Sequence, residues 1–274
     1  MNCCRVTLTT NQDFIALQEL RQYVDIPGTS AFSRLSSLLP GYRGHFFPAM
    51  NYSNGTLQEG IGFLTTLNFK HPTFSMLNHE YPASEDGNLR GIGMVEISVK
   101  ARQVFLIFTH WAVPTYDQHF NAKDSLKFMT DAGRTADDAI VFLGDFNTQL
   151  ESSELSEHEC NLLGYPLDSC PRSSSAPLSI LTNSSFRFMD SWEIAAMIDG
   201  DEVFSYCNCK ISLGDIQGCH REKRLDRVFV TRSVEVTRAS IAGAQIPGEL
   251  CPSDHLYYSA TLEFNHNDPV ADIM

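Results

Sequence analysis

Apolar residues along this chain fall mainly into short runs, the pattern that predicts β-strands. The clearest run covers residues 140–143, four large apolar side chains typical of a strand buried on both faces. It continues into Gly144-Asp145-Phe146-Asn147. If the backbone stays extended, Asp145 and Asn147 lie on one face and Phe146 points back into the core. The ordinary alternative is a strand followed by a turn rich in Asp and Asn.

The other elements follow from the same reasoning. Residues 91–108 predict a hairpin, because apolar residues alternate over 91–99 and run together over 104–108. Further strands are expected at residues 6–10, 59–67, 203–207, 225–230, 234–241 and 256–264, and helices at 33–39, 122–135, 152–163 and 188–197. Residues 14–23 fit either a buried strand or a helix. A turn is expected at Tyr52, and loops are expected at 68–88 and 166–185.

The length of 274 residues is enough for one large core, and neither a repeat nor a second apolar cluster divides it. We therefore predict a single mixed α/β domain over residues 1–264 and a polar tail at 265–274. No apolar stretch approaches the roughly 20 residues of a membrane-spanning helix. The N-terminus lacks the pattern of a signal peptide, so the sequence predicts a soluble protein and leaves its compartment open.

Charge and cysteine content narrow the function classes. A formal net charge of -13 argues against a broad basic surface that grips a nucleic-acid backbone. Local phosphate contacts remain compatible with this charge if a divalent cation supplies positive charge. Cys207, Cys209, Cys219 and His220 could form a soft-metal site, but the two-residue spacing of zinc modules is missing, which favours disulfides or buried thiols.

Polar residues stand at the ends of several predicted strands, where a purely structural core would not need them. They are Glu19, His110, Asp145, Asn147, Asp226, Asp254 and His255. Each is weak evidence by itself, but in this order they resemble the endonuclease/exonuclease/phosphatase superfamily of metal-dependent phosphoesterases. The resemblance covers residues 11–264, and its most specific parts are Gly144-Asp145-Phe146-Asn147 and Ser253-Asp254-His255.

The resemblance implies both a fold and an activity. The fold is a four-layered α/β/β/α sandwich of two mixed β-sheets, with the site at one end of the sheets. The activity is hydrolysis of phosphodiester bonds, nuclease-like or sphingomyelinase-like, by attack of water on phosphorus with Mg²⁺ or Mn²⁺ as cofactor. The family pattern begins with a strand that ends in a metal-facing Asn. Too few residues precede Glu19 for that strand, so we expect this chain to lack it.

The resemblance also assigns roles at the metal and the phosphate. Glu19 would hold the divalent cation, and Asp254 would bind or approach it. Asp145 and Asn147 would contact the scissile phosphate and position the attacking water, and Asp145 is one of two candidates for the general base. These roles suit phosphodiester cleavage, which needs charge neutralisation at the phosphate oxygens, an in-line water and a stabilised leaving group.

Two histidines complete the implied site. Asp226 would hydrogen-bond His255 and raise its basicity, which makes His255 the favoured general base. His110 would be a second histidine that faces the phosphate. Two further positions match supporting residues of the family: Glu59 is the acid behind that second histidine, and Arg90 is an arginine near the site.

The implied partner is a phosphodiester substrate, either a nucleic acid or a phospholipid headgroup, and we expect a monomer without a stable protein partner. The acidic balance and the aromatic residues Phe46, Phe47 and Trp111 favour a small or lipid-headgroup substrate, although core packing is the favoured explanation of these aromatics. The alternative function is that of an inactive or truncated family member acting as a binding or scaffold domain. The set of site residues favours the enzyme, and the missing first strand favours the alternative.

Overall fold

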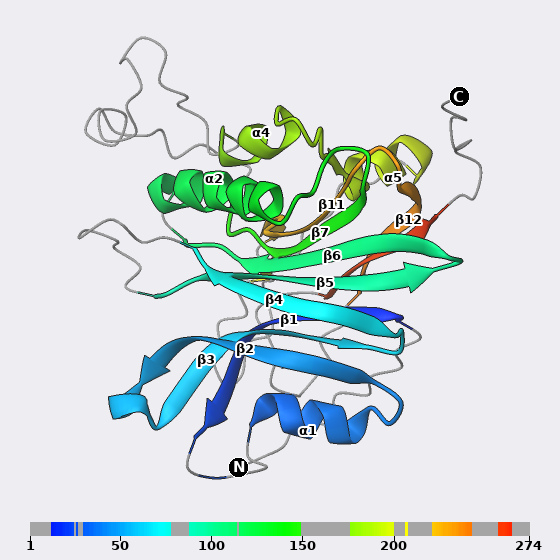
Figure 1. Ribbon diagram of the computed structural model, residues 1–274. Helices are drawn as coiled ribbons and strands as arrows, with labels where there is room; N and C mark the ends of the chain where they lie inside the picture. The colour runs from blue at the N-terminus through cyan, green and yellow to red at the C-terminus, as the bar shows by residue number, and fades with distance from the viewer. Residues whose placement is uncertain are drawn as a thin grey trace.

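The computed structural model describes residues 12–24, 26, 30–77, 88–113, 115–148, 176–199, 206–207, 221–242 and 257–264. These residues form four layers (Figure 1). Helices α2 (Thr115–Asp131) and α4 (Ala176–Thr182) cover one face of a six-stranded sheet, a second sheet faces its other side, and α1 (Ala31–Leu38) lies outside that second sheet. The predicted α/β/β/α sandwich is confirmed. The expected loss of a first strand concerns residues 1–11, outside the described part, and stays a prediction.

The six-stranded sheet holds the centre of the molecule. Its strands, in spatial order, are β4 (Phe69–Met76), β5 (Gly91–Val99), β6 (Arg102–His110), β7 (Ala139–Asp145), β11 (Asp226–Val230) and β8 (Met189–Asp190). Strands β6 and β7 run parallel, and the other neighbours are antiparallel. Helix α5 (Ser191–Asp199) follows β8 directly.

The second layer of strands is antiparallel. Its members are β1 (Phe14–Tyr23), β3 (Leu57–Thr65) and β2 (Arg43–Tyr52), in the order β1-β3-β2, with the short helix η1 (Ser53–Gly55) between β2 and β3. Two separate antiparallel pairs are formed by β12 (Glu235–Ala242) with β13 (Tyr257–Glu263), and by β9 (Tyr206–Cys207) with β10 (Arg221–Lys223).

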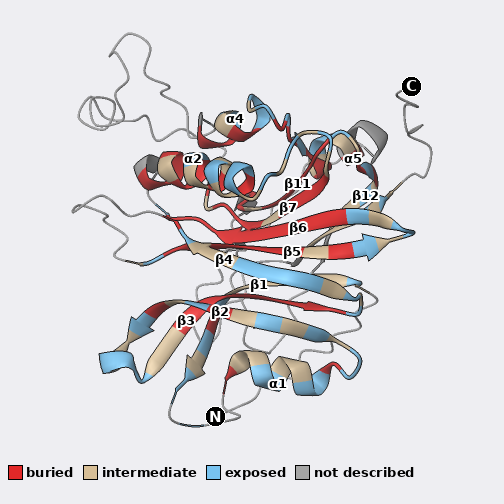
Figure 2. Ribbon diagram, in the orientation of Figure 1, coloured by how far each residue is buried: buried red, intermediate tan, exposed pale blue. Residues whose placement is uncertain are grey.

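Alternation along β6 and β7 decides which side chains face each layer. Phe105 and Ile107 belong to the core under α2 and α4, whereas Val104, Leu106 and Phe108 belong to the core between the two sheets. Figure 2 shows both strands buried over most of their length. By the same alternation, His110 lies at the end of the layer between the sheets.

Strand β4 lies in a predicted loop, and strand β2 covers a stretch for which no strand was predicted. Both differences have a physical cause. Strands β2 and β4 contain Pro48 and Pro72, and the pairing register of each strand shifts close to its proline. A proline and a bulge break the alternation by which a strand is recognised in a sequence. Strand β4 is also the partly exposed edge of its sheet, so it lacks an apolar run.

The remaining predictions are mostly confirmed. The hairpin β5–β6 and the strands β3, β7, β11, β12 and β13 occur as expected, and residues 14–23 form a strand rather than a helix. Helix α2 begins at Thr115, before the predicted start at residue 122. The start was predicted too late because the first turns bury polar residues such as Gln118 and Asn121, which conceal the apolar periodicity. Helix α4 lies inside a predicted loop. The strand expected at residues 6–10 and the helix at 152–163 are outside the described residues. Within the described part, no helix has the length and apolar character needed to cross a membrane.

Candidate active site

Three neighbouring strands of the central sheet end in polar residues that stand side by side. The parallel register of β6 and β7 places His110 beside Asp145. The antiparallel register of β7 and β11 places Asp226 opposite Asp145. Residues paired in this way share a face of the sheet, so the three side chains lie on the face toward the second sheet. The structure therefore brings together three of the residues predicted from the sequence.

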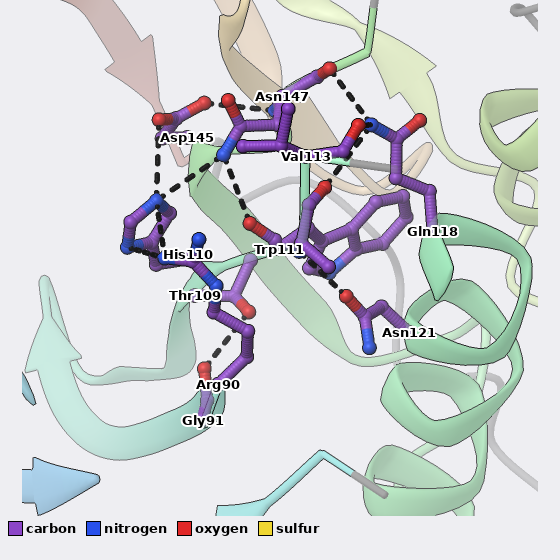
Figure 3. A network of polar contacts seen from close by, with 11 residues as sticks. Arg90, Gly91, Thr109, His110, Trp111, Val113, Gln118, Asn121, Asp145 and Asn147 are labelled. Atoms are coloured by element: carbon purple, nitrogen blue, oxygen red, sulfur yellow. Dashed lines mark hydrogen bonds and ion pairs between the residues drawn. The ribbon is translucent and has the colours of Figure 1, made fainter. Parts of the chain in front are cut away.

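His110 is the centre of a polar network (Figure 3). Its Nε2 lies 3.4 Å from Asp145 Oδ2 and 3.2 Å from Asn147 Nδ2. Arg90 Nη1 lies 2.8 Å from Nδ1 and 2.9 Å from Nε2 of the same ring. A guanidinium, an amide NH₂ and a carboxylate thus surround one imidazole, and all but the amide belong to buried residues.

Asn147 leaves the strand in a left-handed conformation, with φ at 50°. Its N–H donates to Asp145 Oδ1 at 2.8 Å, and its Nδ2 donates to the carbonyl of Trp111 at 2.9 Å. Of the two alternatives for this stretch, the turn rich in Asp and Asn is the one observed, and the amide of Asn147 still reaches the site. The expected burial of Phe146 in the core is confirmed, and its ring packs edge-on against Trp111.

Gly144 explains why this turn can form at the end of β7. Its φ is 146°, which side-chain-bearing residues rarely adopt. A Cβ at this position would also lie 2.1 Å from the carbonyl oxygen of Thr109. Glycine is thus required where β7 passes closest to β6, immediately before Asp145.

A pocket opens next to this network, between the ends of the two sheets. Its lining consists of Glu19, Ala49, Glu59, Gly60, Ile61, Leu89, Arg90, Gly91 and His110. Glu19 sits at a register shift in β1 with a φ of 51°, and it is exposed. This bulge gives the carboxylate of Glu19 access to the pocket, opposite the strand end that carries His110.

Glu59 lies in the same pocket but forms its ion pair with Arg21. The Nε of Arg21 donates to Glu59 Oε2 at 2.5 Å, and this hydrogen bond raises the pKa of Arg21. The resemblance implied that Glu59 is the acid behind His110. In the structure, the acid at 3.4 Å from His110 is Asp145, and Arg90 contacts the ring directly. Burial raises the pKa of Tyr52, and the charge of Glu59 raises it further.

The expected metal ligands lie only partly within the described residues. Among them, no group of three His, Cys, Asp or Glu side chains is arranged around a common ion position. The exposed carboxylate of Glu19 offers hard oxygen ligands beside the phosphate-binding candidates, which fits one contact to a cation such as Mg²⁺. Asp254, the second expected metal-site residue, and His255, the favoured base, lie outside the described residues.

Sequence reasoning did not indicate that Gln118 contacts the site. It did predict correctly that the aromatic residues are explained by core packing. Gln118 on α2 donates to the carbonyl of Asn147, and nothing in its sequence neighbourhood signals this. Trp111 and Phe47 are buried in the two cores, and Phe46 packs against Phe32 of α1. Core packing is thus the correct explanation of these aromatics, and they carry no argument about the substrate.

Comparisons with known proteins bear on the family and the fold of this chain. The model of the endonuclease/exonuclease/phosphatase family matches residues 4–255. A search of curated proteins found no match. A solved endonuclease/exonuclease/phosphatase from Bacteroides vulgatus is 18% identical, with a TM-score of 0.63 over 92% of this chain and 85% of that chain.

Two further solved structures are of a protein with a named activity and of a protein with a bound anion. The mannosyl-6-phosphatase of Bacteroides thetaiotaomicron VPI-5482 is 15% identical, with a TM-score of 0.60 over 92% of this chain and 85% of that one. The catalytic domain of human Nocturnin with a bound sulfate anion is 18% identical, with a TM-score of 0.57 over 91% and 81%. At these identities the likeness establishes the fold.

Proposed function

Because the chain belongs to the endonuclease/exonuclease/phosphatase family, whose members are hydrolases acting on phosphoester bonds, we propose that it is a divalent-metal-dependent phosphodiesterase. The observation that carries the proposal is the network of Arg90, His110, Asp145 and Asn147 beside a pocket that contains Glu19. This network combines hydrogen-bond donors for a phosphate with a carboxylate for the attacking water. The substrate we propose is a small or headgroup-like phosphodiester, since the net charge of -13 disfavours a long nucleic acid.

The donors would act on the phosphate. Arg90, with a guanidinium beside the His110 ring, brings a fixed positive charge to the pocket wall. Asn147 and His110 add N–H groups that are held by their neighbours before the substrate arrives. Preorganised donors of this kind stabilise the charge that develops on phosphate oxygens in the transition state.

The acids would act on the water. Asp145 Oδ1 accepts the N–H of Asn147, and its Oδ2 points toward His110, so the carboxylate is held at the edge of the network. Asp226 stands opposite Asp145 at the start of β11, a position from which it would orient His255 as the base. Asp145 remains the other candidate for the proton acceptor.

A divalent cation fits the pocket chemically. Family enzymes generally depend on such a cation, and Glu19 would hold it here together with Asp254. When bound, the cation would supply charge neutralisation at the phosphate and at the leaving oxygen.

The experiment is a substrate panel with the purified full chain. Plasmid DNA, single-stranded RNA, sphingomyelin, a bis-aryl phosphate and an aryl phosphomonoester are each tested with Mg²⁺ or Mn²⁺, with and without chelator. We expect chelator-sensitive turnover of at least one diester. Turnover of the monoester alone would replace the proposed phosphodiesterase with a phosphatase. No metal-dependent turnover at all would favour the binding or scaffold domain.

A further inference from the structure

Gln118 joins two loops of the site from helix α2 (Figure 3). Its Nε2 donates to the carbonyl of Asn147 at 2.8 Å, and it also lies 2.8 Å from the carbonyl of Val113 and 3.1 Å from that of Ala112. The first loop follows β6 and the second follows β7. One buried amide nitrogen therefore bridges the ends of both strands that carry the site.

The orientation of this amide is fixed by its surroundings. A primary amide has two N–H donors, and here three carbonyl oxygens converge on them. Its own Oε1 is buried and has no hydrogen-bond partner among the residues that the structure describes. Turning the amide over would place this oxygen against the three carbonyls, so Gln118 is held as a donor. An unpartnered buried acceptor has a free-energy cost that calls for an explanation.

The acceptor of this hydrogen bond, Asn147, has an uncommon backbone conformation. Asn147 has a positive φ, a conformation that Asn adopts more readily than most side-chain-bearing residues but that still depends on the contacts around it. Its N–H is bound by Asp145, its Nδ2 contacts Trp111 and His110, and its carbonyl is bound by Gln118. Among these contacts, the bond to Gln118 is the one that comes from a helix rather than from the strand ends. This bond connects the backbone of Asn147 to helix α2.

We propose that Gln118 is a positioning residue, which holds Asn147 in its left-handed conformation so that the Asn147 side chain stays at His110 and the phosphate site. The inference rests on the proposed function, in which Asn147 contacts the phosphate. Gln118 itself touches no reacting atom. Its effect on the reaction therefore passes through Asn147, and that route can be tested.

The test is a double-mutant cycle between Gln118 and Asn147. Gln118→Met keeps the length of the side chain and removes the donor, and Asn147→Ala removes the amide at the site. We expect Gln118→Met to lower kcat by about 10- to 100-fold, with a smaller change in KM, because a small misplacement of a catalytic group costs this much. In the Asn147→Ala background the same substitution has no further effect. A merely structural glutamine would give additive losses.

Asn121 provides the matched control on the same helix. Its Oδ1 accepts the N–H of Ala112 at 2.8 Å, so it is a buried amide of α2 that contacts the same loop without touching Asn147. Asn121→Ala should lower the melting temperature and leave kcat within about twofold of wild type, since the cost of a lost buried hydrogen bond falls on stability. If Gln118→Met does not fold, Gln118→Asn replaces it in the double-mutant cycle, because the shorter side chain moves the donor away from the Asn147 carbonyl by one methylene.

Binding of inorganic phosphate in the presence of Mg²⁺, measured by calorimetry, gives a readout without turnover. Gln118→Met and Asn147→Ala should each weaken phosphate binding, and the double variant should be no weaker than Asn147→Ala. Wild-type kcat and phosphate affinity in Gln118→Met, or additive effects in the double variant, overturn the inference. An inactive wild type would overturn the proposed function instead, and the phosphate cycle would still decide the role of Gln118.

Discussion

Strand β11 contributes one residue to each of two polar clusters on opposite faces of the central sheet. Asp226 faces the layer between the sheets, opposite Asp145. Arg227, the next residue, faces the helical side, where its Nη1 donates to Asp190 Oδ2 at 2.7 Å. Both clusters are buried to the same degree, since Asp145 is 6% exposed and Asp190 is 3% exposed. Burial alone therefore does not identify the functional cluster.

The difference lies in what each cluster borders. The Asp190 cluster is closed on itself: Arg224 binds both carboxylate oxygens at 3.1 and 2.8 Å, and Arg227 binds one of them as well. Burial and the nearby charge of Arg224 lower the pKa of Arg227. The His110 cluster instead borders the pocket that contains Glu19. Position at the end of the sheets, where a ligand can enter, separates a site from a structural ion cluster.

The largest expected effect is loss of activity at the open cluster. Asp145→Asn keeps the shape of the side chain but removes the charge that would activate water or orient His110, so we expect kcat to fall by about 10²- to 10⁴-fold. The matched control is Asp131→Asn, the same chemical change at an exposed ion pair with Lys127 on α2. Steady-state kinetics on the active diester measure both. Equal rates for Asp145→Asn and Asp131→Asn would remove Asp145 from the mechanism.

The closed cluster should respond in stability rather than in chemistry. Asp190→Ala leaves Arg224 and Arg227 buried without the carboxylate that both bind, and we expect a loss of about 3–5 kcal/mol in the free energy of unfolding. Glu193→Gln is the control, because Glu193 is exposed and lies 3.9 Å from Arg224. Urea unfolding followed by circular dichroism compares the two. A loss below about 1 kcal/mol for Asp190→Ala would show that these ion pairs do little for the fold.

A smaller effect on the free energy of unfolding is expected from His119, a buried histidine of α2 on the helical side of the sheet. Burial and, to a smaller extent, the charge of Lys123 together lower the pKa of His119 from 6.5 to about 4. The unfolded chain therefore binds a proton that the folded chain excludes once the pH falls below about 6.5. Stability from this group is complete above that pH and is lost as the pH falls toward 4. Between pH 7.5 and pH 5 the loss is about 2 kcal/mol.

His119→Gln tests this pH dependence. The variant should lose less stability than wild type between pH 7.5 and pH 5, because the proton-linked contribution is gone. Urea unfolding at both pH values gives the difference. Parallel loss in wild type and variant would mean that His119 titrates normally in the folded protein.

The sequence located the strand ends of the site but not the contacts between them. The apolar run before Asp145 and the dense strand before His110 each predicted a buried strand that ends in a polar group, and both strands are confirmed. The strands β2 and β4 were not predicted, because a proline and a register shift interrupt each of them. The sequence left an extended strand and a turn as alternatives at Asn147, and the turn forms because Gly144 and the Asp145 carboxylate together favour it.

The sequence by itself determined which strands are buried, which faces they show, and which polar residues end them, because these properties depend on residues close together in the chain. The tertiary structure decided which of those residues meet. Arg90 reaches His110 because of the pairing register between β5 and β6, and Gln118 reaches Asn147 because α2 connects the parallel strands β6 and β7. Such contacts join residues 20 and 29 positions apart, and no local pattern specifies them. The sequence therefore predicted which polar residues end the strands of the candidate site, but not the contacts that hold them there.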